Sequence, residues 1–372
     1  MSPVRIGSVC TGYGGLDVAV QEVFGGSLAW VADNDPGASR ILAHHYPRVP
    51  NLGDITAVRW EDVEPVDILC GGYPCQPFST AGKRKGTADD RHIWPYIACA
   101  LRVLRPRYAV FENVAGHLSL GFDTVLADLA ALGFDAEWCV VRADQVGAAH
   151  QRKRLFILAR LADARRAGLA RRWPEGAASD GGIPAAHAVD LGGDRGRARG
   201  AGRDEPAARR LAAADAACVG EREPADQAQS LAGSGQAWQE PGRGGGGAAA
   251  TADRNGREEQ QRSEPGLGTR GDPDGCGPQR WGPYAAAIER WAQVIGRPAP
   301  RPTDDLGRLN PPFVEWLMGL DNGHVTAVPD LSRTAQLKAL GNGVLPQQAI
   351  AALRLMTSST EQGQGHSAGV AA

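Results

Sequence analysis

Apolar residues in the first part of the chain, up to about Arg160, form short runs separated by stretches of helical periodicity. The runs are strongly apolar and are often followed by Gly, Pro or Asn, which is typical of strands buried in a parallel sheet. The predicted strands are Val4–Cys10, Leu28–Ala32, Val66–Cys70, Tyr108–Phe111, Glu137–Val141 and Leu155–Ala159.

Helical patterns lie between these strands. In Phe122–Leu132 the apolar residues share one helix face, and Gly133 ends the pattern. Ile97–Leu104 is a second helix, which stops before Pro106. Strands that alternate with helices in this way predict a doubly wound α/β sheet.

The composition changes sharply between about Asp163 and Pro278, where Ala, Gly, Arg, Asp and Pro follow one another without apolar periodicity. Gly244–Gly247 is an unbroken glycine run. Such a stretch buries too little apolar surface to offset the entropy of ordering it. We therefore expect a low-complexity and largely disordered insert.

Aromatic residues return near Trp281, and helical patterns return with them. We expect helices over Ala285–Ile295, Pro312–Leu317 and Gln347–Met356. The tail from Thr357 to the end is expected to be disordered.

The 372 residues carry a formal net charge of -2, so the chain is not basic overall. A nucleic-acid site would require positive charge concentrated in one cleft. No run is long and apolar enough to span a bilayer, and the first residues lack the pattern of a secretory signal, so we expect a cytoplasmic protein without a membrane partner. The seven cysteines include no CxxC pair, and no metal site is expected.

Thr11–Asp17 is a glycine-rich turn directly after the first predicted strand. Its glycines Gly12, Gly14 and Gly15 let the backbone approach a ligand at a helix N-terminus, although such turns are also common without ligands.

Three acidic positions follow this turn. Asp33, at the end of the next strand, can hold a ribose hydroxyl pair; alternatively Asp33 or Asp35 caps a helix. Asp54 and Ile55 can contact a base edge. Together with the glycine turn, these positions predict a nucleoside cofactor.

Cys75 follows the strand Val66–Cys70, at the carboxyl edge of the sheet where ligands collect. Prolines on both sides stiffen its loop. A thiol held there becomes a nucleophile if its pKa is lowered, and is otherwise an ordinary loop thiol.

Charged residues stand beside two later strands. Glu112 follows Tyr108–Phe111, and a buried carboxylate must be paired or protonated; a raised pKa suits a proton donor, whereas the alternative is a structural loop cap. Arg152 and Arg154 precede Leu155–Ala159 on one side of the strand. Paired guanidinium groups suit a phosphate, a carbonyl oxygen or Glu112, and the alternative is a solvated basic patch.

The order of a glycine turn, Pro-Cys-Gln, Glu-Asn-Val and Arg-x-Arg resembles the cytosine-5 DNA methyltransferase family, of bacterial or phage type. The resemblance covers about Val4–Arg160 and Arg308–Met356. It implies a Rossmann-like methyltransferase sheet that uses S-adenosyl-L-methionine. It also implies methylation of cytosine C5 in a specific duplex DNA sequence, with the target base flipped out of the helix.

The resemblance implies a role for each catalytic element. Cys75 adds to C6 of cytosine, and Glu112 protonates or hydrogen-bonds N3. Arg154, with Arg152, holds Glu112 and the carbonyl of the base or the neighbouring phosphate. The residues expected to contact the DNA substrate are Gln76, Ser79 and Asn113.

The resemblance also implies a cofactor pocket, with Asp33 at the ribose and Asp54 at the adenine. The expected cofactor-binding residues are Gly12, Tyr13, Gly14, Gly15, Asp33, Asn34, Asp54, Ile55, Pro74, Asn342 and Val344. Asp89 and Arg91 match a further family element near the cofactor loop.

Three positions depart from the family pattern. Cys10 stands where the family usually has Phe, His150 where it has Gln, and Gly343 where Ser is common. None of these changes removes a catalytic group, so activity is expected.

The C-terminal part resembles the segment that returns to the catalytic domain. Arg308–Gly319 resembles the family segment that packs under the recognition domain, and Leu340–Val344 its last motif, which completes the cofactor pocket. Residues 161–306 would then be the target-recognition region. Within it, Arg297, Arg301 and the aromatics of Trp281–Trp291 either read DNA or pack ordinarily.

Two other functions remain open. An RNA-acting branch shares these motifs, so the chain could be a tRNA cytosine-5 methyltransferase; the extended Asn310–Gly319 segment and the large insert favour duplex DNA. The third reading is an inactive DNA-binding or regulatory homologue, against which the intact Cys75, Glu112 and Arg154 argue. We expect a monomer, and a cognate restriction endonuclease if the chain serves a restriction-modification system.

Overall fold

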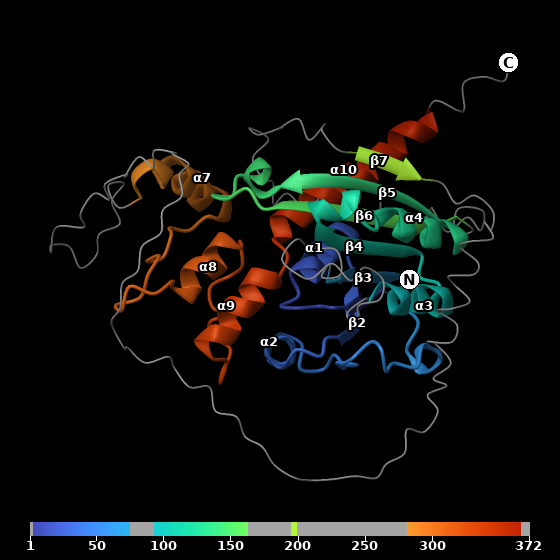
Figure 1. The fold of residues 1–372 in the computed structure, drawn as a ribbon, viewed down its shortest axis with the longest axis horizontal. Helices are drawn as coiled ribbons and strands as arrows, with labels where there is room; N and C mark the ends of the chain where they lie inside the picture. Colours follow the sequence, from blue (N-terminus) through green and yellow to red (C-terminus); the bar gives the residue numbers. More distant parts are fainter. Residues whose placement is uncertain (1–2, 75–92, 163–194, 199–280, 366–372) are drawn as a thin grey trace, which may run out of the picture. The chain divides into compact units, whose positions relative to one another are not determined.

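The structure is a computed structural model of the chain, and it describes residues 3–74, 93–162, 195–198 and 281–365 (Figure 1). These residues belong to one compact unit. A second unit, residues 222–280, lies outside the described residues, as does most of the expected insert. Within the described part, no helix is long and apolar enough to cross a membrane.

A seven-stranded sheet forms the centre of the described unit, in the order β2-β1-β3-β4-β6-β5-β7. The strands are β1 (Arg5–Val9), β2 (Ser27–Ala32), β3 (Ile68–Gly72), β4 (Tyr108–Val114), β5 (Phe134–Arg142), β6 (Lys153–Leu161) and β7 (Arg195–Ala198). All six strands expected from the sequence are present. The seventh, β7, pairs with β5 from within the segment expected to be disordered.

The strands β2, β1, β3 and β4 are parallel, but β6 runs antiparallel to both β4 and β5. The expectation that every strand is parallel is therefore wrong for β6. The antiparallel direction of β6 follows from the short connection 143–152, which holds only the short helix η5 (Ala143–Val146). A parallel crossover needs about a dozen residues or more, whereas a shorter connection joins antiparallel neighbours.

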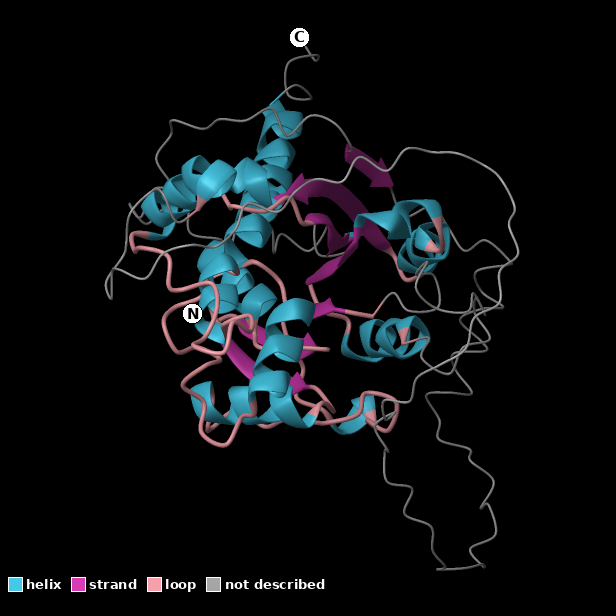
Figure 2. Ribbon diagram, turned by 60° about the vertical axis from the view of Figure 1, so that its left-hand side comes forward, coloured by secondary structure: helices cyan, strands magenta, loops and turns pink. Residues whose placement is uncertain are grey.

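Side chains of the strands alternate between two apolar cores, one on each face of the sheet. On one face Ile6 and Val110 pack with helices α1 (Gly15–Phe24), α9 (Arg333–Asn342) and α10 (Pro346–Gly365). On the other face Leu69 and Phe111 pack with α3 (Trp94–Leu104) and α4 (Phe122–Ala131). Figure 2 shows the helices on both sides of the strands, which is the doubly wound arrangement expected from the sequence.

The five helices expected from apolar periodicity are present as α3, α4, α7 (Ala285–Ile295), α8 (Pro311–Leu317) and α10. Helix α10 continues to Gly365, so the expectation of a disordered tail from Thr357 is wrong up to that residue. Helix α7 packs into the core that contains Ile6 and Val110: Trp291 is buried, and its Nε1 donates to the carbonyl oxygen of Trp316 at 2.9 Å. Of the two interpretations of the aromatics in Trp281–Trp291, ordinary packing is therefore the correct one for Trp291.

The register of the parallel strands brings their carboxyl ends to one edge of the sheet. Val9 lies opposite both Ala32 and Gly71, and Gly72 lies opposite Glu112. The loops that leave β1, β2, β3 and β4 therefore emerge side by side. The residues expected to bind the cofactor and the base follow directly from these strand ends.

Candidate active site

The glycine loop leaves β1 in a conformation that few side chains allow. Cys10 has a φ of 51°, and Gly12 and Gly14 have φ values of 61° and 85°. The backbone N–H of Cys10 donates to the carbonyl oxygen of Ala32 at 2.8 Å, which fixes the loop to the end of β2. A Cβ on Gly12 would meet no atom within 4 Å, so the loop presents backbone to open space.

Asp33 closes this loop from the next strand. Its Oδ2 accepts from the backbone N–H of Gly12 at 2.8 Å, and its Oδ1 accepts from that of Asp35 at 2.9 Å. Burial raises the pKa of Asp33 in spite of these two donors. Each carboxylate oxygen retains a second lone-pair direction, which is what a vicinal pair of hydroxyl groups requires.

Asn51 holds Asp33 in place and was not singled out from the sequence. Its Oδ1 accepts from the backbone N–H groups of Asp33 and Gly53, each at 3.0 Å. Its Nδ2 donates to the carbonyl oxygen of Asp33 at 3.1 Å. The only sequence indication is an Asn two residues before a glycine, in a pattern typical of side-chain-stabilised turns.

Asp54, Ile55 and Cys10 are the other positions considered near this loop, and they differ in exposure and charge. Asp54 is exposed and accepts from the backbone N–H of Thr56 at 2.9 Å, whereas Ile55 is buried. Burial, and then the charges of Asp33 and Asp54, raise the pKa of the Cys10 thiol to about 12. Cys10 is therefore a neutral thiol whose position lies near both carboxylates.

The expectation that an aspartate here caps a helix is confirmed for Asp35. It is the N-cap of α2 (Pro36–His45), and its side chain accepts from the backbone N–H groups of Gly37 and Ala38. Lys338 of α9 also donates to Asp35, and this bond holds the pKa of the Asp35 carboxyl below its usual value. Asn34 is exposed beside it.

Glu112 and Arg154 form a largely buried ion pair at the end of β4. The Nε of Arg154 lies 2.7 Å from Oε1 of Glu112, and the Glu112 residue is 7% exposed. The antiparallel register places Glu112 opposite Phe156, so Arg154, two residues away, lies on the same face. Burial raises the pKa of Glu112, and the charges of Arg154 and Arg152 oppose that rise.

The second oxygen of Glu112 faces the meeting point of three elements. A Cβ on Gly72, at the end of β3, would lie 3.3 Å from Oε2 of Glu112 and 3.7 Å from a methyl carbon of Val344. The absence of a side chain at Gly72 leaves room there. The carboxyl group, the start of the Cys75 loop and the last motif therefore converge.

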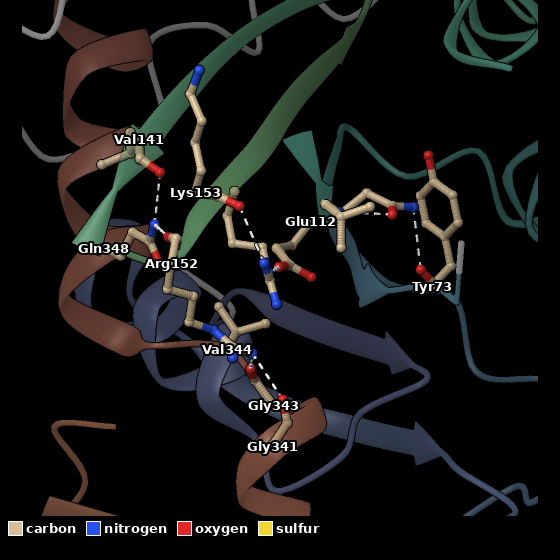
Figure 3. Close-up of polar contacts among 12 residues, drawn as sticks. Tyr73, Glu112, Val141, Arg152, Lys153, Gly341, Gly343, Val344 and Gln348 are labelled. Carbon is tan, nitrogen blue, oxygen red and sulfur yellow. Dashed lines mark hydrogen bonds and ion pairs between the residues drawn. The ribbon is translucent and has the colours of Figure 1, made fainter. Parts of the chain in front are cut away.

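Arg152 does not form a direct ion pair with Glu112. Its Nη2 donates to the carbonyl oxygens of Gly341 and Gly343, at 3.1 Å and 2.6 Å (Figure 3). The backbone of Arg152 has a φ of 20°, and the Nε2 of Gln348 donates to its carbonyl oxygen at 2.7 Å. The expectation that Arg152 holds Glu112 directly is thus corrected: its side chain fastens the last motif to β6.

Asn113 acts on the loop that leads toward Cys75. It is 2% exposed, and its Nδ2 donates to the carbonyl oxygen of Tyr73 at 3.2 Å. The phenol of Tyr73 lies 2.9 Å from Nε2 of His117. These contacts fix the chain up to Pro74, the last described residue before Cys75. Buried in this way, Asn113 positions the loop.

Several expected site residues lie outside the described residues. They are Cys75, Gln76, Ser79, Asp89 and Arg91. Among the described positions, a hydrogen bond joins Gly12 to Asp33, and both Asp33 and Asp54 lie near Cys10. In a second group Glu112 pairs with Arg154, and Gly72 lies close to both Glu112 and Val344. Asn342 is exposed at the end of α9. Nowhere in the described ranges do three or more His, Cys, Asp or Glu side chains form a cluster that could hold a metal ion.

Glu315 is a buried residue that the sequence did not single out. It is 0% exposed and accepts from the backbone N–H groups of Gly323, Val325 and Thr326, at 2.8, 2.6 and 2.9 Å. These bonds fix the segment that carries His324, whose Nε2 lies 2.9 Å from the carbonyl oxygen of Tyr13. A single Glu within the apolar sequence Phe-Val-Glu-Trp-Leu is the indication that could have revealed it.

Arg297 and Arg301, for which DNA reading and ordinary packing were the two alternatives, make contacts within the protein. Arg297 donates to Oδ1 of Asn322 at 2.9 Å and to the carbonyl oxygen of Leu320. Arg301 forms an exposed ion pair with Asp305 at 3.0 Å. His150, in place of the usual Gln, has its Nε2 3.0 Å from the carbonyl oxygen of Leu317 and so ties the start of β6 to α8.

Asp17 is a buried carboxyl in the first turn of α1, beneath the glycine loop. Its Oδ1 accepts from the thiol of Cys70 at 3.5 Å. Its Oδ2 has no hydrogen-bond partner within the part of the chain that the structure describes. Burial raises the pKa of Asp17 from 3.8 to about 6.

Replacing Asp17 with asparagine is expected to remove a loss of stability that the protein suffers as pH rises. At pH values below about 4 the carboxyl is protonated in both the folded and the unfolded chain, so it adds no pH dependence. Between about 4 and about 6 the unfolded chain loses its proton first, and the folded state is then destabilised by up to about 3 kcal/mol. Urea unfolding of both proteins at pH 4 and pH 8 measures the difference. Equal pH dependence in the two proteins would contradict this account.

The first part of the chain matches the model of one known protein family. Residues 4–180 match the family model described as C-5 cytosine-specific DNA methylase. This match confirms the resemblance over the first part of the chain, whereas the resemblance of Arg308–Met356 stays a prediction.

Two curated relatives and one solved structure illustrate the similarity. The type II methyltransferase M.NgoBV of Neisseria gonorrhoeae is 34% identical over 134 residues, which are 33% of this chain and 32% of that protein. A protein of Escherichia phage P1 described as a DNA N-6-adenine-methyltransferase is 37% identical over 147 residues, 35% of this chain and 19% of that protein. The Dnmt2 methyltransferase of S. pombe has a TM-score of 0.38 and 22% identity, covering 43% of this chain and 51% of that chain. The chain thus spans about a third or less of the length of these curated relatives.

Proposed function

We propose that this chain, which belongs to the DNA cytosine-5 methyltransferase family through residues 4–180, transfers a methyl group to C5 of cytosine in duplex DNA. The methyl donor is S-adenosyl-L-methionine, and the reaction proceeds through a covalent adduct of Cys75 with a flipped-out base. The observation that carries the proposal is the buried Glu112–Arg154 pair, which lies at the sheet edge from which the Cys75 loop departs.

The glycine loop and Asp33 fit the adenosyl cofactor. Gly12 leaves open space where a side chain would stand, and each carboxylate oxygen of Asp33 retains acceptor capacity for a ribose hydroxyl. Asp54 is exposed beside the loop and suits the adenine amino group. When bound, the cofactor supplies an electrophilic methyl group.

The residues of this chain then divide the chemistry of the base. The Cys75 thiolate forms a bond to C6, and the electron pair of the C5–C6 double bond moves into the ring toward N3. Burial raises the pKa of Glu112, which favours its protonated form, and Glu112 protonates or hydrogen-bonds N3, where negative charge develops. C5 thereby becomes a nucleophile toward the methyl group.

Regeneration of the enzyme requires the reverse movement of electrons. After methyl transfer a general base removes the C5 proton, the C5–C6 double bond reforms and the C6–S bond breaks, which returns the thiolate. N3 gives back to Glu112 any proton that it received. Arg154 keeps Glu112 oriented throughout, because the 2.7 Å ion pair fixes one carboxyl oxygen and leaves the other facing Gly72.

Product analysis tests this proposal. The full chain is incubated with labelled S-adenosyl-L-methionine and an equal mixture of unmethylated duplex DNA and tRNA. Each nucleic acid is then digested to nucleosides and analysed by mass spectrometry. We expect 5-methyl-2′-deoxycytidine from the DNA and no label in the tRNA.

The other outcomes identify the competing functions. Label in tRNA would replace the proposal with an RNA methyltransferase, and N6-methyl-2′-deoxyadenosine would replace it with adenine methylation, the activity named for the phage P1 relative. An absence of both methyl transfer and covalent trapping on a 5-fluorocytosine duplex would indicate an inactive DNA-binding homologue. Bisulfite sequencing of DNA from cells that express the chain then identifies the recognised sequence.

A further inference from the structure

Tyr13 lies in the glycine loop, but its side chain is directed into the protein. The residue is 0% exposed, and its hydroxyl donates to the carbonyl oxygen of Val344 at 2.6 Å. The ring packs edge-on against His324, with centroids 6.0 Å apart. Tyr13 was expected among the cofactor contacts, and its side chain joins the first loop to the last motif.

The ring of Tyr13 is enclosed by two glycines. A Cβ on Gly343 would lie 1.8 Å from Cε1 of the ring and 2.3 Å from Cζ. A Cβ on Gly15 would lie 2.6 Å from Cε2. Gly343 has a φ of -78°, which any residue adopts, so only space requires glycine there. The ring thus occupies the volume that a side chain at position 343 would need.

Side chains from the N-terminal part also hold the backbone of the last motif. The carbonyl oxygens of Gly341 and Gly343 accept from Arg152 (Figure 3), and that of Val344 accepts from Tyr13. Arg152 is in turn fixed through its own carbonyl oxygen by Gln348. Of these hydrogen bonds, the one from Tyr13 to Val344 comes from the glycine loop.

We propose that Tyr13 is a positioning residue, whose ring and hydroxyl hold the backbone of Gly343 and Val344 against the glycine loop, and that Tyr13 and Gly343 form a matched pair in which the large residue requires the small one. The proposal rests on the proposed function in one respect, namely that this pocket binds S-adenosyl-L-methionine. The steric coupling of Tyr13 and Gly343 does not depend on that function.

A double-mutant cycle tests the pair. The variants are Gly343→Ser, Tyr13→Ala and the combination of both, with Tyr13→Phe to isolate the hydroxyl. Affinity for S-adenosyl-L-methionine is measured by calorimetry on the full chain. We expect Gly343→Ser to weaken binding at least tenfold when Tyr13 is present, and less than twofold in the Tyr13→Ala background. An equal penalty in both backgrounds overturns the proposal.

Kinetics separate positioning of the cofactor from a general loss of structure. For Gly343→Ser and Tyr13→Phe, KM for the cofactor is expected to rise, while kcat at saturating cofactor and KM for DNA stay within about twofold of the original. A fall in kcat with unchanged KM overturns the assignment of Tyr13 to cofactor positioning. The matched control is Gly116→Ser, since a Cβ there meets nothing within 4 Å, and it should match the unmodified chain.

Urea unfolding without cofactor covers the case in which Gly343→Ser folds poorly. The unfolding midpoint is expected to fall in Gly343→Ser, and the serine is expected to cause no further fall in the Tyr13→Ala background. This readout also distinguishes the two proposals. If the unmodified chain binds no cofactor, the proposed function fails, while the unfolding midpoints still decide whether Tyr13 and Gly343 are coupled.

Discussion

Replacing Glu112 with glutamine is expected to slow methyl transfer by about 10²- to 10⁴-fold, the usual contribution of a positioned proton donor. Glutamine keeps the shape of the side chain, and its carbonyl oxygen still accepts from Nε of Arg154, which lies 2.7 Å from Oε1 of Glu112. The substitution therefore removes the ionisable proton and leaves the packing of β4 in place. The rate is measured in a single turnover at saturating cofactor and DNA.

The pH profile provides the control for this prediction. Activity that needs protonated Glu112 falls as pH rises through the pKa of that carboxyl, which burial raises above its ordinary value of 4.5. Arg154→Gln removes a charge that opposes this rise, so the falling limb should move to higher pH while the rate drops through loss of orientation. A Glu112→Gln variant with the original rate and the original pH profile would remove Glu112 from the mechanism.

The sequence predicts Glu112 and Arg154 as site residues because both stand beside apolar runs, but it does not predict how they meet. The run Leu155–Ala159 has the same appearance whichever direction the strand takes. The direction follows from the short connection 143–152, and the antiparallel register then selects Arg154, and not Arg152, as the partner of Glu112. Register is a property of two strands together and is absent from the pattern of either one.

Helix α9 shows a second limit of apolar periodicity. Of its residues only Leu340 is buried, so the sequence lacks an apolar face that would predict it. The helix is stabilised instead by the Ser332 N-cap, whose Oγ accepts from the backbone N–H of Ala335, and by the bond from Lys338 to Asp35. The second of these contacts joins residues that are far apart in the chain. Local patterns therefore could not reveal it.

The departures from the family pattern become interpretable only with these distant contacts. Gly343, where the sequence comparison expects Ser, faces the ring of Tyr13, and the pair is close only because the last motif folds back on the first. The exposed Asn51 and the buried Gln348 are similar, since each bonds to backbone groups of other segments. Motifs thus indicate candidate site residues, and the packing of segments determines which residues position them.

Replacing Cys75 with alanine is expected to abolish methyl transfer and, on a duplex with 5-fluorocytosine, the covalent adduct. The adduct accumulates on that base because fluorine at C5 cannot be removed as a proton is, so the C6–S bond does not break again. The adduct is measured as a band that survives denaturing electrophoresis. Cys70→Ala is the matched control, because Cys70 is buried within β3 with its thiol directed to Asp17, and it should still form the adduct.

The two catalytic substitutions together separate nucleophile from proton donor. Glu112→Gln retains the thiol, so its adduct should form slowly and reach completion, whereas Cys75→Ala has no atom that can bond to C6. Cofactor affinity should stay within about twofold in both variants, because the groups that fit the cofactor are Gly12, Asp33 and Asp54. An adduct in Cys75→Ala would assign the nucleophile to another residue, and slow methylation without any adduct in the unmodified chain would exclude covalent catalysis at C6.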